Sequence, residues 1–206
     1  MVVFRSAEYI IAMNGADLPI CHLPDGAVHP ATGTLPAVLL PGSFNPLHAG
    51  HRELAAVVQR RTGGPVHFEL SVANVAKPDV PPEELRRRLR QFAGYSPVWV
   101  TRAATFLRKA EHFPGVAFAV GFDTAVRIVD PTYYGGTAEL DRALETLLSL
   151  GCRVIVGGRV DAAGTFRVWD DMSDALPPEL AALFDVIPES EFRVDVSSTA
   201  LRGERK

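Results

Sequence analysis

Cysteine is almost absent from this chain, which has only Cys21 and Cys152 among its 206 residues. Two thiols are too few for a disulfide framework, and their separation matches no structural zinc site. The histidines form no cluster with metal-ligand spacing either. We therefore predict that the fold rests on its hydrophobic core and that the protein itself builds no metal site.

Positive charge is also scarce, with 21 Lys and Arg residues against 24 Asp and Glu residues and a formal net charge of −3. General binders of nucleic acid or membrane surfaces need a cationic face, so we expect neither partner. No apolar run approaches the roughly 20 residues of a spanning helix, and the N-terminus does not resemble a signal peptide. The expected location is the cytoplasm. The sequence leaves open whether the chain forms a homo-oligomer.

Hydrophobic residues are plentiful, at 47% of the chain, which suits one α/β domain with a small appendage. Residues 1–36 form an N-terminal extension with two turn sequences, Asn14-Gly15 and Pro24-Asp25-Gly26. Such turns between short apolar runs predict a hairpin packed on the edge of the main domain. The main domain is expected to cover residues 37–206.

From residue 37 onward, short β-rich apolar runs alternate with helical segments. Because the apolar runs are continuous, we predict parallel strands that are buried on both faces. Right-handed crossovers then give a doubly wound, Rossmann-like parallel sheet of about five strands with helices on both faces. Its ligand site is expected at the carboxyl ends of the strands. The predicted strands are 37–40, 66–72, 98–101, 116–120 and 153–156, and the predicted helices are 51–61, 82–92, 104–112 and 138–150.

The loop after the first predicted strand has the sequence Gly42-Ser43-Phe44-Asn45-Pro46-Leu47-His48-Ala49-Gly50-His51 and enters a helix. His48 and His51 are three residues apart, so both rings should point the same way from the first turn. They would lie beside free N–H groups at the positive end of the helix, which attract phosphate. Donors fixed in this way stabilise the charge that develops during nucleotidyl transfer. A plain loop with two surface histidines is the alternative.

A second segment near the C-terminus, Asp195-Val196-Ser197-Ser198-Thr199-Ala200-Leu201-Arg202, offers hydroxyl groups at a helix N-cap. Free main-chain donors follow the cap, and Arg202 lies one turn further on. This set suits the β- and γ-phosphates of a nucleoside triphosphate, with the guanidinium neutralising the leaving pyrophosphate. Taken alone, the segment would be an ordinary helix cap.

The first segment resembles G-x-F-[DN]-P-x-H-x-G-H, a signature of the HxGH nucleotidylyltransferase superfamily, and the second resembles its I-S-S-T-x-[IL]-R signature. The resemblance covers residues 37–202. It implies transfer of a nucleoside monophosphate unit to a phosphorylated acceptor, with release of pyrophosphate. It also implies catalytic roles for His48, His51 and Arg202. Nucleotide and phosphate binding is expected from Gly42, Ser43, Phe44, Asn45, Gly50, Lys77, Ser197, Ser198 and Thr199, although Lys77 could equally be a solvated loop lysine.

Between the two motifs, Gly121-Phe122-Asp123 resembles the family's G-x-D, whose Asp contacts a ribose; capping of a helix by Asp123 is the alternative. Tyr133 and Tyr134 follow where relatives place a residue that stacks on an aromatic base. Gly121, Asp123, Tyr133 and Tyr134 are thus candidates for acceptor and ribose binding, with core or edge packing the alternative for the tyrosines. The basic run 86–88 with Arg90 is interpreted as a solvated helix face from which one member reaches inward.

The combination of Gly-Ser-Phe-Asn-Pro with Ser-Ser-Thr resembles the nicotinamide-nucleotide adenylyltransferases. This likeness implies ATP as donor, nicotinamide or nicotinate mononucleotide as acceptor, a place in NAD biosynthesis, and Mg²⁺ bound with the triphosphate. Relatives that bind nicotinamide usually have a Trp soon after G-x-D, where this chain has tyrosines. A cytidylyltransferase acting with CTP on a phosphorylated alcohol or phosphonate is therefore an alternative. A nucleotide-binding module without turnover is another, although His48, His51 and Arg202 argue against it.

Overall fold

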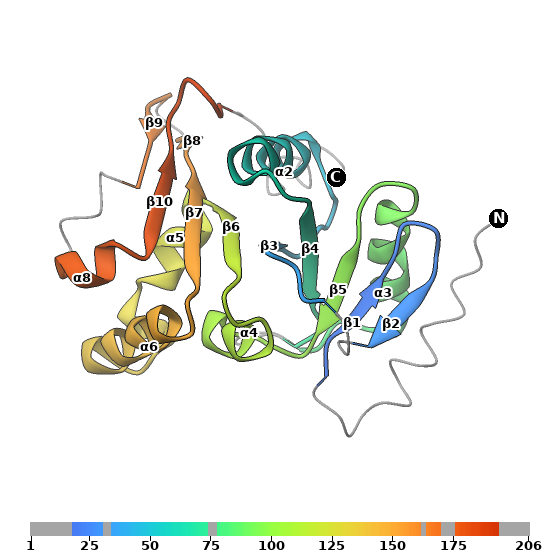
Figure 1. Ribbon diagram of the computed structural model, residues 1–206, viewed down its shortest axis with the longest axis horizontal. Coiled ribbons are helices and arrows are strands. Elements are labelled where there is room, and N and C mark those ends of the chain that lie inside the picture. The colour runs from blue at the N-terminus through green and yellow to red at the C-terminus, as the bar shows by residue number, and fades with distance from the viewer. Residues whose placement is uncertain (1–17, 31–33, 74–77, 162–163, 170–175, 194–206) are drawn as a thin grey trace.

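An eight-stranded, mostly parallel sheet forms the centre of the computed structural model, which describes residues 18–30, 34–73, 78–161, 164–169 and 176–193. The strand order is β10-β7-β6-β3-β4-β5-β1-β2, and Figure 1 shows the strands from left to right in this order. The parallel strands are β3 (Val38–Pro41), β4 (Val66–Ser71), β5 (Val98–Thr101), β6 (Ala117–Gly121), β7 (Arg153–Gly157) and β10 (Phe184–Ile187). A separate two-stranded sheet pairs β8 (Arg159–Val160) with β9 (Phe166–Arg167).

The five predicted strands are all confirmed, with ends that differ by one residue at most from β3, β4, β5, β6 and β7. The parallel part of the sheet has one strand more than predicted, because β10 was missed. This strand is only four residues long, and two of those four are only partly buried. So short a run of mixed burial lacks the continuous apolar character by which the other parallel strands were recognised.

Four predicted helices are confirmed as α2 (Ala49–Thr62), α3 (Pro82–Leu89) with η1 (Arg90–Phe92), α4 (Phe106–His112) and α6 (Thr137–Ser149). The sequence patterns did not predict α5 (Phe122–Ile128), η2 (Pro131–Tyr133) and α8 (Pro178–Ala181). The reason is clearest at α5, where Gly121 is both the last residue of β6 and the N-cap of the helix. No turn sequence separates the two elements, so nothing in the sequence marks where the strand ends and the helix begins.

Helices cover both faces of the sheet, as the doubly wound prediction required. In β3, Val38 and Leu40 belong to the core that contains the buried residues of α2 and α3. Leu39, between them, belongs to the core that contains residues of α4, α5 and α6. Neighbouring residues of a strand point to opposite faces, so β3 contributes to both cores.

The N-terminal strands β1 (Ile20–His22) and β2 (Val28–Pro30) form a hairpin at one edge of this sheet. β1 pairs antiparallel with β5, with Cys21 opposite Trp99. The hairpin turn is closed by a 2.8 Å hydrogen bond from the main-chain N–H of Leu23 to the carbonyl of Ala27, around Pro24-Asp25-Gly26. The other predicted turn, at Asn14-Gly15, lies outside the described residues. The domain boundary at residue 36 stays a prediction.

The direction in which successive strands are added to the sheet reverses at β3. After β3 it adds β4 and β5 on one side, and it then crosses to add β6, β7 and β10 on the other. The register between β3 and β6 consists of Val38 opposite Ala117 and Leu39 opposite Phe118, although both strands continue beyond these pairs. In open α/β sheets, ligands bind at the carboxyl ends of the strands that flank such a reversal. The loops after β3 and β6 therefore mark the candidate site.

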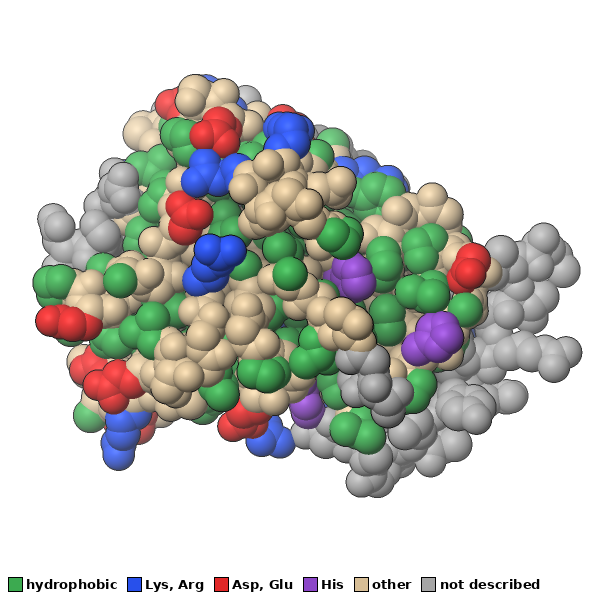
Figure 2. All heavy atoms as spheres, in the orientation of Figure 1, with side chains coloured by type: hydrophobic (Ala, Val, Ile, Leu, Met, Phe, Trp, Pro, Cys, Tyr) green, Lys and Arg blue, Asp and Glu red, His purple; other side chains and the backbone are tan. Residues whose placement is uncertain are grey.

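Acidic and basic side chains are interspersed on the face of the molecule shown in Figure 2 rather than gathered by sign. This mixture agrees with the small net charge of −3. Among the described residues, no helix is both long enough and apolar enough to cross a bilayer.

Candidate active site

Phe44 anchors the loop that connects β3 to α2. Its ring is fully buried and packs edge-on against Phe68 and Phe92, with ring centroids 5.4 Å and 5.2 Å away. A Cβ atom on Gly42 would lie 2.7 Å from the Phe44 ring, so this packing requires a glycine at residue 42. Because the ring of Phe44 belongs to the core, only the main chain of this predicted nucleotide-binding residue is left for a ligand.

The backbone of Phe44 adopts a left-handed conformation, with φ of 45°. A bulky residue rarely takes this conformation, which costs on the order of 1–3 kcal/mol and persists only where the surroundings enforce it. The loop is therefore held in a conformation that its own sequence does not favour. Such strain is common where a backbone must meet a ligand.

His48 and His51 lie together at the start of α2, as their spacing predicted. His48 is the N-cap residue, with extended backbone angles, and its carbonyl accepts the main-chain N–H of His51 at 3.1 Å. The two rings are stacked, with centroids 3.8 Å apart and planes inclined by 29°. The ring of His51 also meets Phe44 edge-on at 5.1 Å, so the core supports the pair. Gly50, between them, is buried.

Hydrogen bonding and burial determine the state of the His51 ring. Its Nδ1 accepts a hydrogen bond from the main-chain N–H of His48 at 3.3 Å. Burial, and next the nearby His48, lower the pKa of His51 to about 3, and burial also lowers the pKa of His48. Both rings are therefore neutral at pH 7. A neutral imidazole that accepts at Nδ1 carries its proton on Nε2, so His51 offers an Nε2–H donor.

Three side chains from α3 and η1 hold the loop from outside. Arg88 donates to the carbonyl of Ser43 at 3.0 Å, and Arg87 donates to Oδ1 of Asn45. The Gln91 amide makes two contacts with the loop, donating from Nε2 to the carbonyl of Phe44 and accepting at Oε1 from the N–H of Leu47, each at 2.9 Å. The loop conformation is thus set by a helix more than 40 residues further along the chain.

Glu84 holds the two arginines in place. It accepts hydrogen bonds of 2.7 Å from both Arg87 and Arg88, on the same helix. The hydrogen bond from Arg87, followed by that from Arg88, lowers the pKa of Glu84 to about 2. The carboxylate therefore remains ionised at neutral pH and orients two guanidinium groups toward the predicted phosphate loop.

The arginines of this helix form a solvated face with one inward member, as predicted. Arg86, Arg87 and Arg90 are exposed and Arg88 is partly buried, although the exposed Arg87 also bonds to the loop through Asn45. The sequence patterns did not predict the role of Gln91. A signal was present, because Glu84, Arg88 and Gln91 recur at helical spacing beside the buried stripe of Leu85, Leu89 and Phe92. A polar stripe next to an apolar one indicates side chains that border the core instead of facing bulk water.

The Gly-x-Asp segment lies where the resemblance implied, at the carboxyl end of β6. Asp123 is in the first turn of α5 and is not its N-cap, which is Gly121. The Asp123 carboxylate accepts a hydrogen bond from Arg159, which follows the end of β7. Arg159 was not among the predicted site residues, and it places a guanidinium beside the predicted ribose-binding carboxylate.

The two predicted stacking residues have different surroundings. Tyr133 is 46% exposed, in η2. Tyr134 is partly buried and packs against the core on the α4, α5 and α6 face. Burial raises the pKa of Tyr134 to about 12. Of the two, Tyr133 has the more accessible ring.

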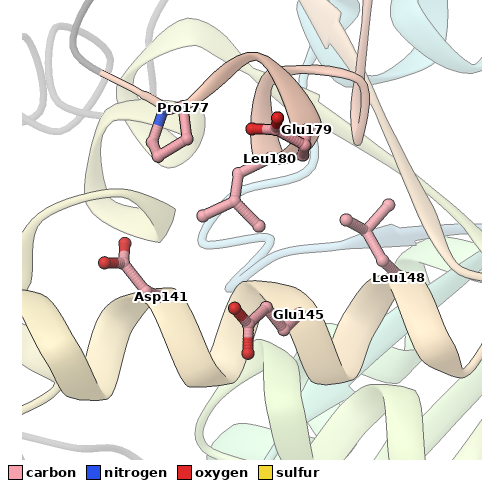
Figure 3. A pocket seen from close by; sticks show the side chains of 6 residues that line it. All are labelled: Asp141, Glu145, Leu148, Pro177, Glu179 and Leu180. Carbon is pink, nitrogen blue, oxygen red and sulfur yellow. The ribbon is translucent and has the colours of Figure 1, made fainter.

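Several predicted site residues lie outside the described residues, namely Lys77, Ser197, Ser198, Thr199 and Arg202. Within the described ranges, no group of three or more His, Cys, Asp or Glu side chains could hold a metal ion. One hollow of about 380 Å³ lies between α6 and α8, and Figure 3 shows its lining. None of the predicted site residues lines this hollow, whose residues are Asp141, Glu145, Leu148, Pro177, Glu179 and Leu180.

A doubly wound parallel sheet, with a histidine pair and a helix N-terminus at its reversal point, defines a nucleotide-binding α/β protein. The family model described as cytidylyltransferase-like matches residues 39–204. The chain therefore belongs to the cytidylyltransferase-like family. Membership supports a nucleotidyltransferase activity, with nucleoside triphosphates and phosphorylated substrates as the ligand classes. A comparison with curated proteins found no match.

Proposed function

We propose that this protein transfers AMP from ATP to nicotinamide or nicotinate mononucleotide and releases pyrophosphate. The observation that carries the transfer step is the geometry of His48 and His51, two stacked neutral imidazoles at the N-terminus of α2. The acceptor phosphate attacks the α-phosphorus of the triphosphate, and the bond from that phosphorus to the leaving pyrophosphate breaks. Charge then grows on the phosphate oxygens, where fixed donors are most effective.

The neutral state of the imidazoles suits this role. His51 donates from Nε2 without first having to gain a proton, because its Nδ1 is occupied by the main-chain N–H of His48. The positive end of the α2 dipole adds to the same electropositive site. Arg202, three residues after Thr199 in the sequence, would neutralise the β- and γ-phosphates.

The identity of the acceptor rests on motif resemblance. The sequences Gly-Ser-Phe-Asn-Pro and Ser-Ser-Thr occur together here, as in the nicotinamide-nucleotide adenylyltransferases. Asp123 would hold a ribose, and the exposed ring of Tyr133 is the better placed of the two tyrosines to stack on a pyridine. Mg²⁺ would arrive with the triphosphate and keep much of its water, as this ion usually does.

A cytidylyltransferase acting on a phosphorylated alcohol or phosphonate is the second candidate. It is favoured by the residues that follow Gly121-Phe122-Asp123, where relatives that bind nicotinamide usually have a Trp and this chain has tyrosines. The phosphate-handling residues would serve both reactions in the same way. The two candidates differ in the nucleobase and in the acceptor.

The deciding experiment measures pyrophosphate release while crossing ATP, CTP, GTP and UTP with a panel of phosphorylated acceptors, with products identified by mass spectrometry. ATP with either mononucleotide should yield a dinucleotide and pyrophosphate. Preference for CTP would replace the first candidate with the second. Nucleotide binding without pyrophosphate release for any pair would overturn both and leave a binding module. The His51→Ala variant is the control for contaminating activity.

A further inference from the structure

We propose that Gln91 is a positioning residue that fixes the loop before the histidine pair and thereby sets the donor geometry of His51. The proposal rests on the proposed nucleotidyl transfer and names a residue that acts through others, without contact to the substrate. It starts from the two ends of one side-chain amide, which bind two main-chain groups three residues apart.

The first contact is made with the strained residue of the loop. Gln91 Nε2 donates to the carbonyl of Phe44 at 2.9 Å, and Phe44 has the left-handed backbone. A conformation of this kind needs support from its surroundings. The buried ring of Phe44 supplies part of that support, and the Gln91 amide holds the peptide group that follows the strained angles.

The second contact is made just before the helix. Gln91 Oε1 accepts the N–H of Leu47 at 2.9 Å, and the next residue, His48, is the N-cap of α2. The main-chain N–H of His48 is the group that donates to Nδ1 of His51. Gln91 therefore holds the peptide immediately before the one that fixes the His51 proton on Nε2. Phe44 provides a second route, because its ring contacts that of His51.

Gln91 is itself well placed to act as a rigid support. It is partly buried, and its Nε2 also donates to the carbonyl of Arg88 at 3.2 Å, within its own helix. Phe92, the next residue, is 1% exposed and stacks edge-on with Phe44. Side chains that are locked by packing hold a site most precisely. A displacement of about 1 Å in the loop would move the His51 donor and reduce the rate strongly.

The test replaces Gln91 with Met, which has a similar length and cannot make these hydrogen bonds. Gln59→Met is the matched control, since Gln59 is exposed on α2. For each variant we would measure kcat and KM by pyrophosphate release, the melting temperature, and the ¹⁵N shifts of the His51 ring, assigned with a His51→Gln sample. These shifts report which ring nitrogen carries the proton.

In Gln91→Met, kcat should fall by a factor on the order of ten or more, while the KM for the triphosphate changes by less than about threefold. The His51 shifts should move from a single Nε2–H tautomer toward a mixture, and Gln59→Met should change neither quantity. Gln91→Glu keeps the acceptor for Leu47 but loses the donor for Phe44, so its effects should be intermediate. It also serves as the second variant if Gln91→Met does not fold.

Unchanged kcat and unchanged His51 shifts in a folded Gln91 variant would overturn the proposal, even if the melting temperature fell. A fall in kcat with unchanged shifts would also overturn it, because the effect would not pass through His51. If the wild-type protein releases pyrophosphate with no donor, the proposed function fails. The ring shifts, which require no turnover, would still decide whether Gln91 positions His51.

Discussion

The main-chain N–H of His48 donates a hydrogen bond to Nδ1 of His51, 3.3 Å away. The bond links the residue that caps α2 to the residue whose ring lies within its first turn, and it selects the tautomer of that ring. A single local contact thus makes His51 a donor at Nε2 while the ring remains uncharged. Burial lowers the pKa of His51 to about 3, which also keeps the ring uncharged at neutral pH.

Replacing His51 with Ala should lower kcat by a factor of about 10²–10³ with little change in the KM for the triphosphate. The reason is that a fixed donor is most effective where charge develops in the transition state. Steady-state pyrophosphate release is the measurement, and His29→Ala, on the exposed side of β2, is the control. A His51→Ala variant that keeps more than half of the wild-type kcat would exclude this role.

Replacing Arg202 with Ala should weaken binding of the triphosphate by roughly 1.5–3 kcal/mol, about ten- to a hundredfold, through loss of a charge-assisted contact. Binding of the acceptor should change much less. Calorimetric titration with a non-hydrolysable triphosphate measures the effect, with Arg205→Ala as the matched control. Equal affinities for the two variants would remove Arg202 from the site.

Acidification should destabilise the protein well before its carboxylates titrate. Burial lowers the pKa of His22 to about 4, and burial and His48 lower that of His51 to about 3, from 6.5. Between pH 6.5 and about 4 the unfolded chain therefore binds more protons than the folded one, and the free energy of unfolding falls as the pH falls. Each such histidine contributes a slope of up to about 1.4 kcal/mol per pH unit.

Urea denaturation at pH 7, 6 and 5 measures this dependence. Glu84, whose pKa is lowered to about 2, loses its stabilising contribution only below about pH 4.5, so it does not interfere in this window. The His51→Gln variant should show a shallower slope than the wild type. Parallel slopes for the two proteins would mean that His51 is not protected from protonation by the fold.

The buried ion pair of Glu69 and Lys109 yields a prediction about stability. Glu69 is 0% exposed and Lys109 is 5% exposed, and Nζ lies 2.8 Å from both carboxylate oxygens. Thr101 and the carbonyl of Ala103 complete the network. Lys109→Met should reduce the free energy of unfolding by about 3–5 kcal/mol, because it leaves a buried carboxylate without its cation.

The matched control for Lys109→Met is Arg142→Met, which breaks the exposed ion pair with Glu139 and should cost less than about 1 kcal/mol. In the double variant Glu69→Met and Lys109→Met, the unpaired charge is removed and much of the loss should be recovered. Chemical denaturation measures all three. A double variant less stable than Lys109→Met alone would show that the pair itself, rather than the orphaned charge, dominates.

The sequence by itself determined the five strands from β3 to β7, four of the helices and the placing of the histidine pair at the start of α2. The strands from β3 to β7 and the stacked His48 and His51 followed from patterns that involve only neighbouring residues. Apolar runs, turn residues and a spacing of three in a helix are local, so they can be recognised without knowledge of what lies nearby in space. The family resemblance was equally local, because it rests on two short contiguous segments.

Only the tertiary structure decided what holds that loop in place. Gln91 and Arg88 reach back more than 40 residues to the loop, and Glu69 on β4 meets Lys109 on α4 across 40 residues. The same applies to β1, whose pairing with β5 depends on which strand forms the edge. These contacts depend on the order of strands and the approach of helices. That arrangement minimises exposed apolar surface over the whole chain, and no single segment encodes it.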